Sequence, residues 1–398
     1  MNEQVLKSQK QSDQALPTGS AQSPADRGLI SPPTISLPKG GGAIRGIGEK
    51  FSANPVTGTG SMSVPISASP GRAGFGPQLA LSYDSGSGNG LFGLGWSLSL
   101  PAITRKTDKG LPRYLDNEES DVFILSGAED LVPVLDGAGR RPKPTPCTVY
   151  GKRFLLRRYR PRIEGLFALI ERWTDESEPA NIFWRTISRD NITTWYGRTP
   201  ESRIADPADA SRIFQWFICE THDDKGNVAS YGYLPEDGQE VDRSAPQEFN
   251  RTDPQRTAMR YPKRIRYGNR APFLPSMASG GTAWEQPDDT PGQWMFELVF
   301  DYGEHTGALS TPGAKLPLRA DPFSSHRAGF EVRTYRVCHR VLMFHHFKDE
   351  PGVGLNCMVR STDFEYSEPH LPVVHLRNAR RQGQCGELRV PARGRSGG

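Results

Sequence analysis

The stretch Trp294-Met-Phe-Glu-Leu-Val-Phe-Asp-Tyr302 shows the pattern that decides the fold of this chain. Every second residue in it is a large apolar one, and side chains on an extended strand alternate between its two faces. The stretch is therefore expected to form a strand with one apolar face. Shorter segments with strand character recur at 61–67, 78–83, 96–100, 121–126, 131–135, 182–188, 193–196, 214–220, 229–233, 333–347 and 358–366.

Glycine and proline punctuate these segments. The 398 residues include 42 Gly and 34 Pro, well above the average usage of about 12% for the two together. Helices do not tolerate such punctuation, whereas short strands joined by turns require it. No long amphipathic helix stands out. The sequence therefore predicts an all-β fold built of many short antiparallel strands.

Turn residues predict how neighbouring strands connect. The strand at 131–135 contains Pro133, which has no N–H to give to a strand ladder, so this strand is expected at a sheet edge. Residues 234–258 and 269–293 are rich in Pro, Gly and Asp and are expected to form long surface loops. Hairpin turns are expected at 127–130, 164–165 and 222–227.

The two ends differ in composition from the body of the chain. Residues 1–30 are polar and lack the apolar segment of a Sec signal peptide, so they are predicted to be a disordered lead-in. Residues 31–366 form the predicted β domain. Residues 367–398 contain six Arg and two Glu but no Lys, Asp, Phe, Tyr, Trp, Ile or Met. This basic tail is interpreted as a frame-shifted gene end, with a natural disordered tail as the alternative.

Charge and hydropathy restrict the class of protein. The formal net charge is +4, but the basic tail carries the excess, and the rest of the chain has equal numbers of basic and acidic residues. This balance gives no reason to expect nucleic-acid binding by the body. No apolar run approaches the length of about 20 residues that spans a membrane, so membrane insertion is not expected. Cys147, Cys219, Cys338, Cys357 and Cys385 form no CxxC pair, which favours reduced thiols and folding in the cytoplasm.

Two glycine-rich motifs resemble nucleotide-binding loops. Residues 88–93 satisfy G-x-G-x-x-G, but a strand-like segment ending in Pro101 follows, where a dinucleotide site needs a helix. We interpret the motif as a hairpin turn with Phe92 and Trp96 packing beneath it. Gly40-Gly-Gly42 lacks the G-K-[ST] of a phosphate loop and is interpreted as curved backbone. No cofactor is predicted.

The densest set of potential metal ligands lies near the end of the β domain. It does not match the spacing of any zinc site, and adjacent histidines on a strand point to opposite faces. The set is therefore interpreted as polar positions on a sheet rather than as a metal site. Its members are Cys338, His339, His345, His346 and Cys357.

Several longer motifs resemble the toxin-complex B component, or Salmonella virulence plasmid B family, across residues 31–366. They are specific because each is long and they recur in order along the chain. They are the stretches at 37–50, 53–64, 81–86, 88–96, 121–130, 184–191, 195–199, 341–347 and 360–364.

The resemblance implies a fold, partners and a location. The strands would form a large curved sheet that is part of a hollow shell, completed by a toxin-complex C component and enclosing a toxic fragment of that partner. Domains absent from this chain would dock the shell onto the pore-forming A component. The protein would be made in the bacterial cytoplasm and act outside the cell without a Sec signal peptide. It would be a structural component and not an enzyme.

A basic run on one predicted strand is the candidate functional surface. Aromatic residues are interleaved with its cations, as in some nucleic-acid binding sites. Acidic residues at 171–178 lie across the expected turn, so cross-strand ion pairing is the favoured interpretation. A surface that lines the cavity or contacts a partner is then expected at Arg153, Arg157, Arg158 and Arg160.

An enzymatic alternative follows from the same resemblance, because the Salmonella virulence protein carries a C-terminal ADP-ribosyltransferase. Glu176-Ser-Glu178 is an E-x-E pair of the kind found in such enzymes, but the S-T-S strand that accompanies it is absent from the sequence. No other catalytic constellation is found. The alternative function is therefore the N-terminal delivery module of a truncated ADP-ribosyltransferase toxin. A free-standing glycan-binding module using Trp184, Trp195 and Trp216 ranks last, because these residues alternate like core residues.

Overall fold

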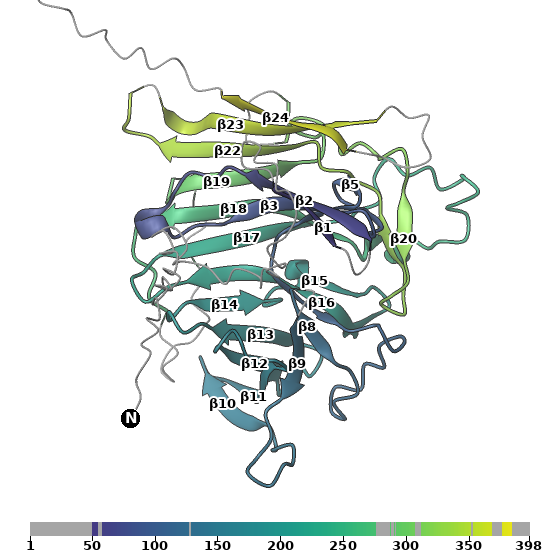
Figure 1. Ribbon diagram of the computed structural model, residues 1–398, viewed down its shortest axis with the longest axis vertical. Coiled ribbons are helices and arrows are strands. Elements are labelled where there is room, and N and C mark those ends of the chain that lie inside the picture. Colours follow the sequence, from purple (N-terminus) through teal and green to yellow (C-terminus); the bar gives the residue numbers. More distant parts are fainter. Residues whose placement is uncertain are drawn as a thin grey trace, which may run out of the picture.

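The computed structural model describes residues 50–54, 58–126, 129–275, 287, 290, 292–306, 312–351, 353–367 and 376–383. Gly40–Gly42 lies outside these residues. The described chain is built almost entirely of antiparallel strands, which confirms the all-β prediction (Figure 1). Its helices are short 3-10 turns, η2 (Arg72–Gly74), η3 (Pro200–Ser202) and η4 (Pro254–Thr257). None of the helices in the described ranges is long and apolar enough to cross a membrane.

A closed β-barrel forms one half of the molecule. Its last strand, β16 (Asp209–His222), is 14 residues long and pairs with two different neighbours within the barrel. Residues 215–217 of that strand pair with β7 (Ala102–Arg105), and residues 218–222 pair with β14 (Thr193–Tyr196), which closes the ring. The barrel strands are β7 (Ala102–Arg105), β8 (Phe123–Leu125), β9 (Glu129–Pro133), β11 (Lys152–Pro161), β12 (Leu169–Asp175), β13 (Ile182–Ile187), β14 (Thr193–Tyr196) and β16 (Asp209–His222). Two further strands, β10 (Thr145–Val149) and β15 (Arg203–Asp206), pair with β11 and β16.

An open sheet continues from the barrel, because residues 220–222 of β16 also pair with β17 (Val228–Pro235). A four-stranded sheet lies over this open sheet in Figure 1. Tyr267 of the open sheet donates its hydroxyl hydrogen to the carbonyl of Ser69, which joins the two layers. The open sheet contains β17 (Val228–Pro235), β18 (Arg260–Asn269), β19 (Trp294–Asp301), β22 (Arg340–Phe347), β23 (Gly354–Tyr366) and β24 (Leu376–Gly383). The smaller sheet contains β1 (Lys50–Asn54), β2 (Thr59–Ile66), β3 (Leu79–Asp84) and β6 (Trp96–Leu98).

Aromatic side chains fill the barrel. Phe123, Trp184 and Trp216 come from strands on different sides of the ring, yet their ring centroids lie 4.8–6.0 Å apart. The indole N–H of Trp216 donates to the carbonyl of Ile182, so its one polar group is satisfied. Trp184, Trp195 and Trp216 are each at most 2% exposed, which confirms their interpretation as core residues.

The strand that contains Pro133 was predicted at a sheet edge, and this prediction is wrong. β9 pairs with β8 through residues 129–131 and with β11 through residues 131–133, so it has neighbours on both sides. Pro133 is the last residue of β9 and lies beyond the end of the β8 ladder. Its missing N–H therefore leaves no ladder hydrogen bond unmade on the β8 side.

The three expected hairpins join β8 to β9, β11 to β12 and β16 to β17. The β pattern does not end at Tyr366, as the sequence suggested, because β24 pairs with β23. Backbone hydrogen bonds at a strand edge do not depend on side-chain alternation, so the sequence pattern gave no signal of this strand. Cys147, Cys219 and Cys338 have free thiols as expected, whereas Cys357 is disulfide-bonded.

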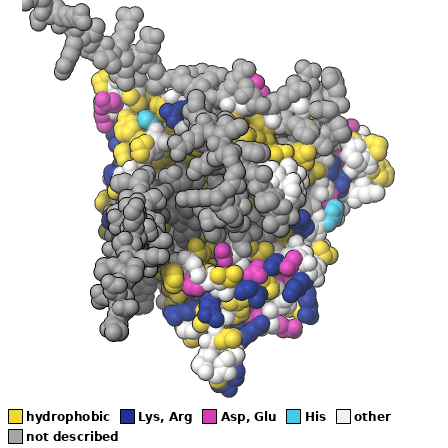
Figure 2. All heavy atoms as spheres, viewed as in Figure 1, with side chains coloured by type: hydrophobic (Ala, Val, Ile, Leu, Met, Phe, Trp, Pro, Cys, Tyr) yellow, Lys and Arg dark blue, Asp and Glu magenta, His cyan; other side chains and the backbone are white. Residues whose placement is uncertain are grey.

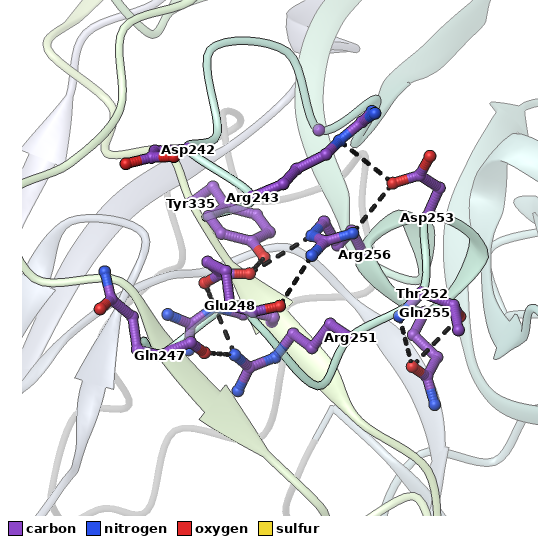
Figure 3. A network of polar contacts seen from close by, with 12 residues as sticks. Asp242, Arg243, Gln247, Glu248, Arg251, Thr252, Asp253, Gln255, Arg256 and Tyr335 are labelled. Carbon is purple, nitrogen blue, oxygen red and sulfur yellow. Dashed lines mark hydrogen bonds and ion pairs between the residues drawn. The ribbon is translucent and has the colours of Figure 1, made fainter. Parts of the chain in front are cut away.

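The loop after β17 was predicted as a surface loop, but buried ion pairs anchor it. Glu248 accepts a hydrogen bond from the hydroxyl of Tyr335 at 2.7 Å and pairs with Arg256 at 3.3 Å (Figure 3). It also pairs with Arg333 at 2.8 Å. Burial raises the pKa of Glu248, but the Tyr335 hydrogen bond and the neighbouring guanidinium groups lower it overall. The loop therefore packs against the hairpin formed by β20 (Phe323–Ser325) and β21 (Val332–Thr334) as part of the folded body.

Replacement of Gly197 by alanine is expected to destabilise the barrel by about 2–3 kcal/mol, from backbone strain and overpacking together. Gly197 has a φ of 65°, and an added Cβ would lie 2.2 Å from Cδ1 of Trp216. The matched control is Gly139→Ala, because Gly139 has a φ of 73° but no atom within 4 Å of an added Cβ. Urea unfolding of both variants measures the loss of stability. Gly139→Ala reports the backbone strain alone, whereas Gly197→Ala reports the strain and the clash together. Equal losses of stability would contradict the expected contact with Trp216.

Candidate interaction surface

The four arginines proposed from the sequence all lie on β11, but they do not share one face. The side chain of Tyr159 lies inside the barrel, and that of Arg157, two residues earlier, is on the same face of the strand. The side chains of Arg158 and Arg160 are on the opposite, outer face. Arg153 is on the same face of the strand as Arg157 but lies at the exposed start of the strand. The structure therefore brings Arg158 and Arg160 together and separates them from the other two.

Ion pairs hold three of these arginines, and two of the pairs cross the hairpin as predicted. Arg153 lies 2.8 Å from Glu176, and Arg158 lies 3.8 Å from Glu171 on the neighbouring strand β12. Arg157 instead pairs with Glu119 at 3.1 Å, a residue that precedes β8 and that the sequence did not indicate. Phe154 and Tyr159, the interleaved aromatics, are 1% and 3% exposed. They cannot stack on nucleic-acid bases, so the nucleic-acid interpretation loses its aromatic component.

The basic character extends beyond β11. Residues 137–163, which contain β10, the turn after it and β11, include nine Lys or Arg and no Asp or Glu. Lys and Arg side chains gather at this end of the molecule, with some acidic side chains between them (Figure 2). The sequence analysis considered only the basic run on β11. The absence of acidic residues along all of 137–163 is the sequence feature that indicates the whole basic surface.

A row of directly opposed residues crosses the outer face from the barrel into the open sheet. Its acidic members, Glu171, Glu220 and Glu297, are each 2–3% exposed. Each lies within 3 Å of an arginine: Arg185 at 2.6 Å, Arg198 at 2.6 Å and Arg266 at 2.9 Å, respectively. A one-residue slip of a strand that carries one of these glutamates would turn the carboxylate to the other face and away from its arginine, so the row favours one register. The charged row consists of Arg158, Glu171, Arg185, Trp195, Glu220, Ser230, Arg266, Glu297 and Phe344.

The charged row makes the stability depend on pH. Burial raises the pKa of Glu297, but a hydrogen bond with His346 and the charges of Arg264 and Arg266 outweigh it and lower the pKa to about 2. The folded state therefore holds the ionised form more strongly than the unfolded chain, whose glutamates have a pKa of about 4.3. This contribution, on the order of a few kcal/mol, is present above pH 4.3 and is lost as the pH falls towards 2.

We expect Glu297→Gln to lose stability at pH 7 and to flatten the pH dependence between about pH 4 and pH 2. Denaturant unfolding of the two proteins at a series of pH values measures this difference. Parallel stability curves for the variant and the unchanged protein would contradict the role of this carboxylate. Glu350→Gln is a suitable control, because Glu350 is exposed and lies in a turn.

The glycine motif at 88–93 forms a hairpin, as predicted. β4 (Asn89–Gly90) and β5 (Gly93–Leu94) pair around it, and Phe92 is 1% exposed against the ring of Phe364. The buried guanidinium of Arg319 donates to the carbonyl of Gly90 and to the side chain of Asn89. These contacts occupy the polar groups of the loop, so its role is structural.

The histidines and cysteines near β22 do not gather around one point. His345 hydrogen-bonds to Ser69, whereas His346 lies 3.4 Å from Glu297 on the opposite face, as the sequence interpretation required. No group of three potential metal ligands occurs among the residues that the structure describes. Glu176 and Glu178 lie in an exposed turn, where Glu176 pairs with Arg153.

Comparison with known proteins places this fold in a family. The family model described as Salmonella virulence plasmid 65kDa B protein, SpvB, matches residues 54–347. The chain belongs to the SpvB family. The mono(ADP-ribosyl)transferase SpvB of Salmonella choleraesuis strain SC-B67 is 38% identical over 357 residues, and SpvB of Salmonella dublin has the same identity. These matches cover 87% of this chain but 56% of each relative, so the SpvB-family chain spans little more than half their length.

Solved structures share the fold. The N-terminal domain of effector protein SpvB from Salmonella typhimurium LT2 matches with a TM-score of 0.71 and 36% identity, over 81% of this chain and 98% of that domain. TcdB2-TccC3 matches with a TM-score of 0.70 and 31% identity, over 88% of this chain and 17% of that chain. The Tc holotoxin pore of Photorhabdus luminescens matches with a TM-score of 0.70 and 30% identity, over 92% and 16%. This SpvB-family chain is therefore a structural domain related to those of toxin complexes.

Proposed function

We propose that this chain is a non-enzymatic wall module: the N-terminal part of a toxin-complex shell that encloses a toxic partner fragment before translocation. One observation carries the proposal. The fold matches TcdB2-TccC3 over 88% of this chain while covering 17% of that much longer chain. A domain used in this way is one section of a larger assembly. Its direct partner would be a C component, and further domains would connect it to a pore-forming A component.

The architecture suits a wall. Closure of the barrel hides strand edges that would otherwise template aggregation. The charged row continues from the barrel into the open sheet and holds both in one register. A sheet locked in this way resists sliding of one strand past another, which a container for an unfolded polypeptide needs. We propose that the protein is made in the bacterial cytoplasm and acts outside the cell.

A chimera tests this proposal. The region of TcdB2 that matches this chain is replaced by the chain, and the chimera is co-expressed with TccC3. We expect the two to co-elute in size-exclusion chromatography. The matched control carries the N-terminal domain of Salmonella SpvB in the same place. A chimera that melts cooperatively but does not retain TccC3 would contradict the wall function.

A second function has support from the 38% identity to proteins named mono(ADP-ribosyl)transferase SpvB. In this alternative the chain is the N-terminal delivery module of such a toxin. Sequencing the gene beyond the codon for Tyr366, and translating it in all three frames, distinguishes the shell function from the delivery function. Propeller-like repeats favour the toxin-complex shell, and an S-T-S strand with an E-x-E pair after a proline-rich linker favours the transferase toxin.

A further inference from the structure

A hollow of about 330 Å³ lies beside β11, where two collinear strands fail to meet. β10 pairs with residues 152–156 of β11, and β9 pairs with residues 159–161. The connecting residues 135–144 leave the sheet, and Arg141, Pro142 and Lys143 among them form part of the wall of the hollow. The hollow therefore results from a gap in the strand ladder and not from loose packing of the core.

The wall of the hollow is basic. Its charged members are Arg141, Lys143, Arg157 and Arg158, and no carboxylate of the described residues lines it. Lys143 makes no ion pair within the described part of the chain, and Arg141 donates to the carbonyl of Glu118 at 3.4 Å. Arg158 has a side chain that is 67% exposed and 3.8 Å from Glu171. Positive charge is therefore in excess at the surface of the hollow.

The nearby carboxylates compensate this charge only in part, because each of them is shared with an arginine outside the hollow. Glu171 is 3% exposed and pairs with Arg185 at 2.6 Å. Glu119 is 4% exposed and is shared by Arg157 and Arg172. Lys152 and Arg160, exposed on the same strand, add further cations with no ion pair in the described ranges.

The volume of the hollow and the apolar residues in its wall indicate which class of ligand it can bind. Val134 is 37% exposed, and Leu156 is half-buried between the cations. The volume is at the lower end of the range for ligand pockets, about 300–1,000 Å³. A single-stranded nucleic acid is typically bound by stacking of its bases on aromatic side chains, but the aromatics of β11 are buried in the core. Mixed apolar and cationic walls instead fit a peptide that carries both apolar and acidic side chains.

We propose that this hollow binds an acidic peptide segment, with alternating acidic and apolar residues, from the polypeptide that the shell holds. The inference rests on the proposed wall function for the presence of that polypeptide. Arg158 and Lys143 supply charge for the carboxylates, and Leu156 and Val134 receive the apolar side chains. Because these cations are largely exposed, each contact is weak, and a chain could be retained without being trapped.

Fluorescence anisotropy with the full chain tests the inference. The probe is a fluorescein-labelled peptide of alternating Glu and Leu, and the comparison peptide carries Gln in place of Glu. We expect Lys143→Glu and Arg158→Glu each to weaken binding of the acidic peptide about tenfold, which corresponds to 1.4 kcal/mol. Arg327→Glu is the matched control, since Arg327 is exposed but lies outside the hollow. Binding should fall as salt rises from 50 to 200 mM.

Several outcomes would overturn the inference. They are equal binding of the Gln peptide, an equal loss with Arg327→Glu, or no loss with Lys143→Glu. Tighter binding of oligouridine or of phosphatidylserine vesicles, weakened by the same substitutions, would assign the hollow to a different ligand. Thermal melting of each variant confirms that the fold is intact. If peptide binding fails while the TcdB2 chimera retains TccC3, only this inference is lost; the reverse result removes the wall function.

Discussion

Replacement of Arg336 by alanine is expected to lower the free energy of unfolding by about 3–5 kcal/mol, the cost of breaking a buried ion pair. Arg336 and Glu236 both have fully buried side chains, with Nη2 of the arginine 2.7 Å from Oε1 of the glutamate. Arg336 also donates to the carbonyls of Leu316 and Gln239. The substitution would leave a buried carboxylate without its counter-charge and two carbonyls without a donor. Denaturant unfolding followed by tryptophan fluorescence measures the loss.

Two companion variants show whether the loss comes from the unpaired charge. Arg327→Ala removes an exposed arginine and is expected to change stability by less than about 0.5 kcal/mol. The double variant Glu236→Gln with Arg336→Met removes both charges and should recover part of the loss. A loss below about 1 kcal/mol for Arg336→Ala would show that the loop after β17 does not depend on this pair.

Trp216→Ala is expected to destabilise the barrel by about 3–5 kcal/mol, as for other large-to-small changes in a core. Trp216 is fully buried, packs against Phe123 and Trp184, and donates its indole N–H to the carbonyl of Ile182. The change would leave a cavity and an unpaired carbonyl where β16 closes the barrel. Urea unfolding, with the midpoint and the slope fitted separately, gives the loss.

Phe249→Ala is the control for this substitution, because Phe249 is 76% exposed and its removal should cost less than about 0.5 kcal/mol. Far-ultraviolet circular dichroism should stay unchanged in both variants at low denaturant. A Trp216→Ala protein as stable as the control would mean that the aromatic cluster does not hold the barrel together.

The positions of most strands could be predicted because their cause is local. The alternation of apolar residues at 294–302 reports that one face is buried, and β19 is found there. The turn at 222–227 could be predicted because Asp223 hydrogen-bonds to the backbone N–H groups of Lys225 and Asn227 within the same segment. The interior position of β9 could not be predicted from the sequence, because it depends on where β8 ends and not on Pro133 itself.

The candidate surface was predicted only in part. Arg153 and Arg158 pair with glutamates across the expected hairpin, since the pairing follows from the turn. The partner of Arg157, Glu119, lies 38 positions earlier in the chain and was not predicted. The hollow beside β11 was not predicted either, because it exists only where β9 and β10 stop short of each other.

The sequence by itself determined the all-β class, most of the strands, the hairpin turns and the basic hairpin, because each depends on residues close together in the chain. The tertiary structure decided that β16 closes a barrel, that Glu236 and Glu248 are buried in a loop that looks polar, and that the charged row runs unbroken from the barrel into the open sheet. Each of these depends on the register between strands that are distant in sequence. Register is set by the packing of whole faces and by ion pairs formed only on folding, and no local pattern contains it.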